Sequence, residues 1–257
     1  MTPKVVQNSY TRHLTPGQWP KTLPTLTEEQ QRIREEFYQI WLEELPHRYG
    51  ILDRFNHGYA TRSANEHTTR TLDIGAGTGE HLNYENLKGG DYTALDLRPE
   101  MGAKIRAAHP TVNVVIGDIQ SRLDFPDHYF DRILAIHVLE HLPDLPKALD
   151  EIQRLLHPNG TFCVLIPCDP GLAYSLGRNL SARRLFERRY KISYDWFIAC
   201  EHINRPDEII TELHSRFRIA HSRYFPLWLP LVDLNLVIGL TLRHPNLTNA
   251  ANSGKRN

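Results

Sequence analysis

The chain has 257 residues, of which 40% are hydrophobic, and its 30 lysine and arginine residues balance 30 aspartate and glutamate residues. This length suits one α/β core with terminal additions, and the balanced charge provides no overall field that would attract nucleic acid or an anionic membrane. Cys163, Cys168 and Cys200 are odd in number and form no CxxC pair. They argue against a disulfide framework or a thiolate zinc site and favour a reducing cytoplasm.

Two segments bear on export and membrane insertion. The first 14 residues contain no apolar run of the length of a secretory signal, so we expect no export. The longest apolar stretch, residues 225–242, is interrupted by two prolines, an aspartate and an asparagine. A spanning helix needs roughly 20 mostly apolar residues, so we expect no stable membrane insertion.

Residues 1–66 are expected to form an arm and cap helices before the core. Residues 1–26 are polar and contain four prolines, which predicts an extended arm without a core of its own. Thr27 and Gln30 have the spacing of a capping box, and the helix that they begin ends near Pro46. A second short helix is expected over residues 48–56.

The first cap helix carries an apolar stripe formed by Ile33, Phe37, Ile40 and Trp41. Such a stripe favours simple packing against the sheet. The alternative is a lid that excludes water from a bound ligand, with aromatic and histidine side chains supplied by Tyr10, His13, Trp19 and Tyr38.

From residue 67 to 245 short apolar strands alternate with helices, which is typical of a doubly wound α/β sheet. The expected strands are residues 71–74, 92–95, 112–116, 130–135 and 160–166. The expected helices are residues 99–108 and 145–156. Beyond Pro167 the pattern predicts one helix over residues 172–189 and strands near 217–223 and 234–242, before a polar tail over residues 246–257.

A glycine-rich loop follows the first core strand in TLDIGAGTGEH and leads into an expected helix. Gly75, Gly77 and Gly79 permit positive φ and let a ligand lie against bare backbone. The spacing is GxGxG, and Glu80 occupies the third glycine position of the dinucleotide fingerprint, while no Lys-Ser or Lys-Thr follows to make a P-loop. Asp73 and Glu80 would repel a pyrophosphate, so the loop favours a cationic ligand such as S-adenosylmethionine.

Two further acids stand at the ends of the next two predicted strands. Asp96 lies about 20 residues beyond the glycines, where a carboxylate can accept from both ribose hydroxyls. Asp118 can accept from an adenine amino group, with Ile119 offering a backbone N–H and an apolar contact. Taken singly, Asp73 is better interpreted as a loop-stabilising acid and Asp118 as a turn residue, but the ordered series favours a cofactor crevice.

The motifs DIGAGTGEH, LDLRPEM, GDIQ, FDRILAIHVLEHL and RLLHPNG resemble the successive motifs of class I S-adenosylmethionine-dependent methyltransferases, in the subgroup of ubiquinone and small-molecule methylases. The resemblance spans residues 71–167. It implies a Rossmann-like sheet of seven strands with an antiparallel last strand. It also implies S-adenosylmethionine as cofactor, with the methionine portion at Gly75, Gly77 and Gly79, the ribose at Asp96, and the adenine at Asp118 and Ile119. The neighbouring residues Asp73, Ala76, Leu97 and His137 complete the predicted cofactor-binding set.

The acceptor side offers several candidate acid/base residues. His137 at the end of the fourth strand is the first candidate base, although a packing role is the alternative. Glu140 and His141 resemble structural helix-start residues of the family. His137 and His141 have the spacing of a metal pair, but no third ligand has clear spacing, so we predict no metal. Glu201 and His202 form a second candidate pair, and the alternative is an ordinary polar loop.

The acceptor is the least determined part of the prediction. Phrases such as YGILDRFNHGY and YDWFIACEHIN are similar to methyltransferases from bacterial surface-polysaccharide gene neighbourhoods, which implies a small or glycan-like acceptor and O-methylation. A basic run could grip an acceptor phosphate, or be a solvated helix face, and it comprises Arg183, Arg184, Arg188, Arg189 and Lys191. The alternative functions are a non-catalytic S-adenosylmethionine-binding protein, an interfacial protein that uses residues 225–240, and a nicotinamide oxidoreductase. For the oligomeric state, a homodimer is an open alternative.

Overall fold

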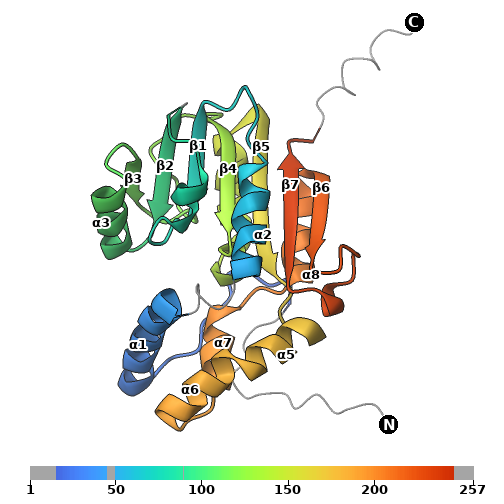
Figure 1. Ribbon diagram of the computed structural model, residues 1–257. Helices are drawn as coiled ribbons and strands as arrows, with labels where there is room; N and C mark the ends of the chain where they lie inside the picture. Colours follow the sequence, from blue (N-terminus) through green and yellow to red (C-terminus); the bar gives the residue numbers. More distant parts are fainter. Residues whose placement is uncertain (1–15, 45–49, 89, 246–257) are drawn as a thin grey trace, which may run out of the picture.

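A seven-stranded sheet forms the centre of the computed structural model, which describes residues 16–44, 50–88 and 90–245 (Figure 1). The strands lie in the order β3-β2-β1-β4-β5-β7-β6. Their bounds are β1 Arg70–Ile74, β2 Asp91–Asp96, β3 Asn113–Ile116, β4 Phe130–Ile136, β5 Leu156–Pro167, β6 Arg218–Phe225 and β7 Val237–Arg243. The predicted number of strands is confirmed, with bounds shifted by a few residues.

Strand direction reverses at one edge of the sheet. The pairs from β3 through β5 are parallel, whereas β7 runs antiparallel to both β5 and β6. The last strand in sequence, β7, therefore lies between β5 and β6, and its antiparallel direction is the one that the family resemblance implied. A hairpin connection suffices for β6 and β7, while parallel neighbours need crossover helices.

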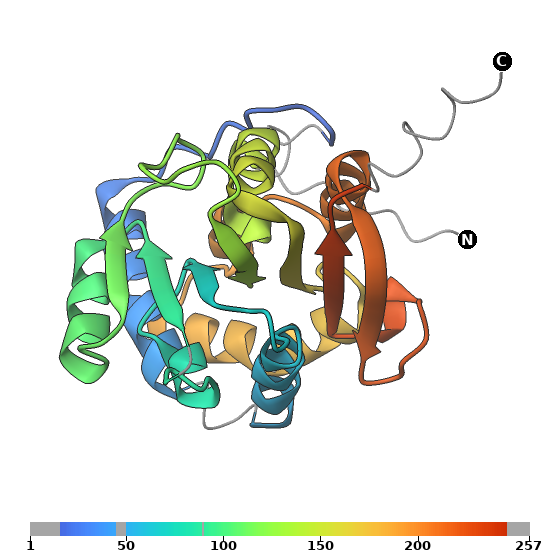
Figure 2. The same cartoon turned by 90° about the horizontal axis from the view of Figure 1, so that it is seen from above.

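Helices cover both faces of the sheet (Figure 2). On one face α4 (Leu145–Leu155) and α8 (Pro206–Arg216) pack on the sheet through a large apolar cluster. On the other, α2 (Gly50–Thr61), α3 (Pro99–Ala108) and the short 3-10 helix η3 (Glu80–Tyr84) form a second cluster. This layering is the doubly wound architecture expected from the alternation of strands and helices.

A group of helices lies beyond the carboxyl ends of the parallel strands (Figure 1). It consists of α1 (Glu28–Glu44), α5 (Leu172–Leu180), α6 (Ala182–Tyr190) and α7 (Asp195–Glu201). Phe37 of α1 is fully buried there against the rings of Phe186 and Phe197, at centroid distances of 5.0 and 5.2 Å. The favoured expectation that this stripe packs on the sheet was wrong, because the stripe meets the aromatic faces of α6 and α7 instead.

The capping box at the start of α1 is confirmed. Thr27 N–H donates to Gln30 Oε1 at 3.0 Å, and Gln30 N–H donates to Thr27 Oγ1 at 3.2 Å. These two bonds satisfy two of the donors that a helix start leaves without partners. The side chain of Trp41 and residues 45–49, which include Pro46 and the start of the second predicted helix, lie outside the described residues.

The described part of the N-terminal arm is anchored to the core by a buried ion pair. Lys21 Nζ lies 2.7 Å from Glu208 Oε1, and the side chains are only 2% and 6% exposed. Lys21 also donates to the carbonyl of Ile203 at 2.8 Å. The arm is therefore held in place by a specific pair on α8, which the polar composition did not predict. Residues 1–15, including Tyr10 and His13, and the tail 246–257 lie outside the described residues.

Two predicted helices and one predicted turn differ from the observed structure. The helix expected over residues 172–189 is divided at Ser181, whose φ of −119° and ψ of −89° are not helical and whose hydroxyl donates to the carbonyl of Gly177 at 2.6 Å. The helix expected after the glycine loop is only the short η3. Residues 157–160, expected in a turn after α4, belong to the irregular start of β5.

The connection between β6 and β7 corrects the expected strand over residues 234–242. Leu234 belongs to the 3-10 helix η5 (Val232–Leu234), and the strand begins at Val237. Exposed apolar side chains gather on this connection and on α5: Leu227, Trp228, Leu229, Leu231, Leu172, Leu176 and Leu180. Among the described residues, no helix has the length and apolarity to cross a membrane.

A buried polar network supports η3 beneath the glycine loop. His81 Nε2 and Arg132 Nη2 both lie 2.8 Å from the carboxylate of Glu85, and Arg132 Nε donates to Thr71 Oγ1 at 3.2 Å. Arg132 is 2% exposed. Because these charges are out of water, each depends on its partner.

We expect Glu85→Gln to lower the free energy of unfolding by about 2–3 kcal/mol, since the charged acceptor of two buried donors is lost. Urea unfolding monitored by circular dichroism measures this change. Glu66→Gln is the control, because the Glu66 side chain is 86% exposed. Equal stability of the two variants would contradict a structural role for the network.

The neighbouring His57 makes stability depend on pH. Burial, and then the proximity of His81, lower the pKa of His57 to about 4. In the unfolded chain the pKa of this histidine is about 6.5. Between pH 4 and pH 6.5 His57 is therefore protonated in the unfolded chain but neutral in the folded one. Stability is fully present above pH 6.5 and is lost as the pH falls towards 4, by up to about 3 kcal/mol. We expect His57→Gln to remove this part of the pH dependence in unfolding curves recorded from pH 7 to pH 4.

Candidate functional site

The sequence-predicted cofactor residues meet at the carboxyl ends of β1, β2 and β3. Gly75 follows β1, Asp96 ends β2, and Asp118 follows β3 by two residues. The strand order reverses between β1 and β4, and ligands of open α/β sheets bind at such a switch point. A cavity of about 160 Å³ lined by Arg70, Asp91 and other residues lies at the opposite, amino ends of the strands, away from these motifs.

The glycine loop has the backbone conformation that its sequence predicted. Gly75, Gly77 and Gly79 have φ values of 64°, 57° and 87°. A Cβ at Gly75 would lie 2.6 Å from a methyl of Val138, so packing alone excludes a side chain there. At Gly77 a Cβ would meet only Glu80 Oε2 at 3.7 Å. The loop thus presents open backbone at Gly77, where a ligand can approach closely.

Asp96 joins the glycine loop to the next strand. Its Oδ2 accepts from Gly77 N–H and its Oδ1 accepts from Arg98 N–H, both at 2.9 Å, and the residue is 4% exposed. Arg98 in turn lies over the ring of Tyr38 at 4.5 Å from the centroid. This contact places Tyr38 of helix α1 beside the Asp96 end of the crevice, as in the lid alternative, whereas the sequence indicated no role for Arg98.

The other predicted cofactor residues have mixed surroundings. Asp118 accepts from the backbone and side chain of Gln120 at 2.9 and 3.1 Å, so it forms a turn, while Ile119 is buried beside it. Leu97 is 64% exposed next to Asp96 and offers apolar surface for a planar ring. Ala76 is buried in the loop, and its N–H donates to Leu95 O at 3.0 Å.

Asp73 lies inside the sheet and is 2% exposed. Tyr92 donates its hydroxyl to Asp73 Oδ2 at 2.9 Å, and burial raises the pKa of this carboxyl. The negative charge of Asp73 therefore contributes less to the electrostatic potential at the loop surface than the sequence suggested, and its repulsion of a pyrophosphate is weaker. The alternative interpretation, a loop-stabilising acid, agrees with this position.

His137 stands directly after β4 with a left-handed backbone, φ 54°. Asn56 Nδ2 donates to its Nε2 at 2.9 Å, and its Nδ1 lies 3.4 Å from Glu140 Oε1. Both ring nitrogens thus face protein groups. This geometry suits a positioning residue for Glu140, and the role of base remains a prediction.

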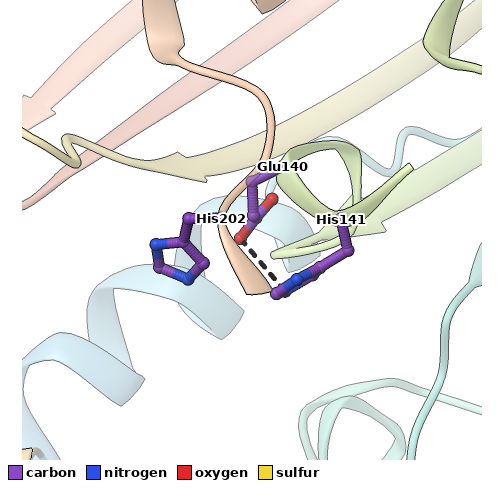
Figure 3. A group of neighbouring side chains, drawn as sticks. All are labelled: Glu140, His141 and His202. Carbon is purple, nitrogen blue, oxygen red and sulfur yellow. Dashed lines mark ion pairs between the residues drawn. The ribbon is translucent and has the colours of Figure 1, made fainter. Parts of the chain in front are cut away.

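Glu140, His141 and His202 come together from two distant parts of the chain (Figure 3). The first two belong to the 3-10 helix η4 (Leu139–His141), and His202 follows α7. Asn204 ties the segments together, because its Nδ2 donates to the carbonyls of Leu139 and Leu142 at 2.7 and 2.8 Å. Asn204 is 2% exposed, and nothing in the local sequence indicated this role.

His202 is oriented by a buried acid. Its Nδ1 lies 2.7 Å from Asp169 Oδ2, and Arg178 of α5 pairs with the same carboxylate. Burial alone would raise the pKa of Asp169, but its partners His202 and Arg178 hold that pKa below its ordinary value. The Asp–His pair leaves the Nε2 of His202 directed away from the acid, which is the arrangement of a general base.

Glu201, the other half of the predicted pair, lies 2.6 Å from Arg34 Nε, so it links α7 to α1. Two of the five basic residues of the run are engaged in ion pairs. Arg183 pairs with Glu187 and Asp195, and Arg189 pairs with Glu36. These pairs favour the solvated-face interpretation of the run over a phosphate grip.

The central segment of the chain is similar in sequence to known proteins. Residues 72–164 match the family described as a methyltransferase domain. A malonyl-[acyl-carrier protein] O-methyltransferase of Pectobacterium atrosepticum is 33% identical over 104 residues, which are 40% of this chain and 41% of that protein. A chloroplastic 2-methyl-6-phytyl-1,4-hydroquinone methyltransferase of Oryza sativa is 31% identical over 113 residues, 40% of this chain and 32% of that protein. The chain thus matches less than half the length of either relative.

A solved structure resembles more of the chain. The 1,6-didemethyltoxoflavin-N1-methyltransferase of Burkholderia thailandensis, with bound S-adenosylhomocysteine, superposes with a TM-score of 0.55 over 88% of this chain and 94% of that one. The two sequences are 19% identical, so the likeness concerns the fold. It extends beyond the central segment to include helices and strands on the carboxyl side.

Proposed function

Because residues 72–164 match a methyltransferase domain, we propose that this protein is an S-adenosylmethionine-dependent methyltransferase and that it methylates a hydroxyl oxygen of a small-molecule acceptor. The observation that carries the choice of oxygen is the Asp169–His202 pair, 2.7 Å apart. A hydroxyl must lose its proton during methyl transfer, and an imidazole fixed by a carboxylate is suited to accept it. The Pectobacterium relative is also named as an O-methyltransferase.

The crevice fits S-adenosylmethionine on three structural grounds. Gly77 exposes bare backbone, Asp96 is a buried carboxylate at a strand end, and Leu97 adds exposed apolar surface. We assign the methionine portion to the glycine loop, the ribose to Asp96, and the adenine to Leu97, Asp118 and Ile119. When bound, this cofactor supplies a methyl carbon on a positively charged sulfur, so that the acceptor oxygen bonds to carbon while the carbon–sulfur bond breaks and sulfur keeps the electron pair.

The chain's own residues align the acceptor and manage its proton. His202 lies within the same cluster as Glu140, which follows β4, so the base stands at the switch point beside the cofactor crevice. Helices α1 and α7 are joined on this side by the ion pair of Arg34 and Glu201. Positioning of this kind supplies much of the rate of an in-line displacement.

The acceptor chemistry follows from the surface beside the cluster. The exposed side chains Leu172, Leu176 and Leu180 of α5 and Leu227, Trp228, Leu229 and Leu231 of the β6–β7 connection are 48–71% exposed, whereas Arg183 and Arg189 are engaged in ion pairs. We therefore propose an acceptor that combines a hydroxyl with an apolar portion, in preference to the glycan-like acceptor suggested by the sequence. The three buried cysteines are unpaired, which agrees with action in a reducing cytoplasm.

The test is a methylation assay with deuterium-labelled S-adenosylmethionine and a panel of acceptors, read by mass spectrometry. The panel contains long-chain and aromatic hydroxyl compounds, polyhydroxylated sugars, and matched amines that lack a hydroxyl. We expect a labelled methyl ether from an apolar hydroxyl compound. Labelled amines only would overturn O-methylation, and labelled sugars only would overturn the apolar acceptor.

A further inference from the structure

The cluster of Glu140, His141 and His202 has the composition of a metal site. One ligand atom from each side chain lies within 4.8 Å of the other two, and the Glu140 carboxylate is seen between the two imidazole rings in Figure 3. The sequence predicted no metal because a third ligand was missing beside His137 and His141. Folding supplies that ligand from 61 residues further along the chain, as the positions of His141 and His202 show.

Both imidazoles are held with the same nitrogen available. His141 Nδ1 lies 2.6 Å from the carbonyl oxygen of Glu201, and His202 Nδ1 lies 2.7 Å from Asp169 Oδ2. Carbonyl and carboxylate oxygens only accept, so each Nδ1 carries the proton and donates it. Each Nε2 is left as a potential ligand, and metal-binding histidines are oriented by this kind of hydrogen bond to a carboxylate or carbonyl.

Glu140 supplies a negative charge that the surrounding protein does not satisfy. The residue is 1% exposed, and neither carboxylate oxygen has a hydrogen-bond partner. The imidazoles of His137 and His141 approach Glu140 Oε1 only to 3.4 and 3.8 Å. Removing a carboxylate from water is costly unless it is paired or coordinates a metal, so a cation between these side chains explains its burial.

We propose that Glu140, His141 and His202 bind a divalent transition-metal ion, with Zn²⁺ as the representative ion. Two imidazoles and one carboxylate suit zinc and similar metals, whereas Mg²⁺ prefers oxygen ligands. Three protein ligands leave at least one coordination position open. His141 is 38% exposed, so this position is accessible from solvent.

The proposed role of the metal rests on the proposed function. A hydroxyl oxygen bound at the open position becomes more acidic, because the cation stabilises the alkoxide. In metal-loaded protein the hydroxyl proton would pass to water, because the Nε2 of His202 would then be a ligand. His202 would accept the proton directly only in metal-free protein. Asp169 then acts as a positioning residue that fixes the His202 ring.

Metal binding is tested on the full chain after treatment with a chelator and dialysis. Zn²⁺ is titrated by calorimetry, and Co²⁺ is used as a spectroscopic probe because its visible absorption reports coordination. We expect one equivalent of each ion to bind, with no displacement by an equal concentration of Mg²⁺. His202→Asn and Glu140→Gln should each weaken Zn²⁺ binding at least tenfold, and Asp169→Asn should weaken it by about 10–100-fold.

His67→Ala is the matched control, since the His67 side chain is 85% exposed. It should bind Zn²⁺ like the unmodified protein. The proposal is overturned if no stoichiometric binding occurs, if Mg²⁺ is preferred, or if His202→Asn retains full affinity in protein that circular dichroism shows to be folded. Zn²⁺ binding without transfer to any hydroxyl would support the metal site and overturn the proposed function. Undiminished O-methylation by metal-free protein would support the proposed function and overturn the role of the metal in it.

Discussion

Replacing His202 with asparagine is expected to lower kcat for the hydroxyl acceptor by about 10²–10⁴-fold, the range lost with a positioned acid/base group. Asparagine keeps a polar side chain of similar size but cannot take the proton or bind the proposed metal in the same way. KM for S-adenosylmethionine should change little, because His202 lies on the acceptor side. Steady-state kinetics with both substrates varied measures the two effects separately.

His214→Asn provides the control for this variant, because His214 is an exposed histidine on α8. It should retain the unmodified kcat. A His202→Asn protein that is folded and fully active would show that the cluster takes no part in the reaction. In that case His137, whose role as base remains a prediction, would be the next residue to replace.

Replacing Asp96 with alanine is expected to weaken binding of S-adenosylhomocysteine by about 100–1,000-fold. The carboxylate would otherwise make charge-assisted hydrogen bonds to the ribose, each contributing about 1.5–3 kcal/mol. Its loss also leaves the N–H groups of Gly77 and Arg98, which now donate to this carboxylate, without their acceptor. Isothermal titration calorimetry gives the dissociation constant directly.

Asp91→Ala, at the exposed opposite end of the same strand, is the matched control and should bind S-adenosylhomocysteine normally. Calorimetry with NAD on the unmodified protein tests the nicotinamide alternative, and we expect no binding. Tight NAD binding, or full S-adenosylhomocysteine affinity in Asp96→Ala, would contradict the assignment of the crevice. The melting temperature of each variant separates a binding effect from unfolding.

The sequence did not predict that Glu140, His141 and His202 form one cluster. Glu140 and His141 were identified as family motif residues, and His202 as a candidate base, but their meeting depends on Asn204 and on the buried Asp169. These contacts join residues more than 30 positions apart. No local pattern encodes such a contact, so the sequence predicted neither the partner acid nor a third metal ligand.

The helical cap is a similar case. Its apolar stripe was correctly assigned to a buried face, yet the partner is the aromatic surface of α6 and α7 rather than the sheet. Periodicity states which face of a helix is buried, because the apolar side chains must leave water. It does not state against what they pack, which depends on how the whole chain folds.

By itself the sequence determined the order of the cofactor-binding features along the chain: the glycine turn, then Asp96 and Asp118 at successive strand ends. It also determined the alternation of strands and helices that requires a parallel sheet. These features are local, since positive φ, strand periodicity and capping act within a few residues. Only the tertiary structure decided which side chains share a site. It buried Asp73, engaged both nitrogens of His137, and brought His202 to Glu140 and His141, because charges removed from water are stabilised by partners from any part of the chain.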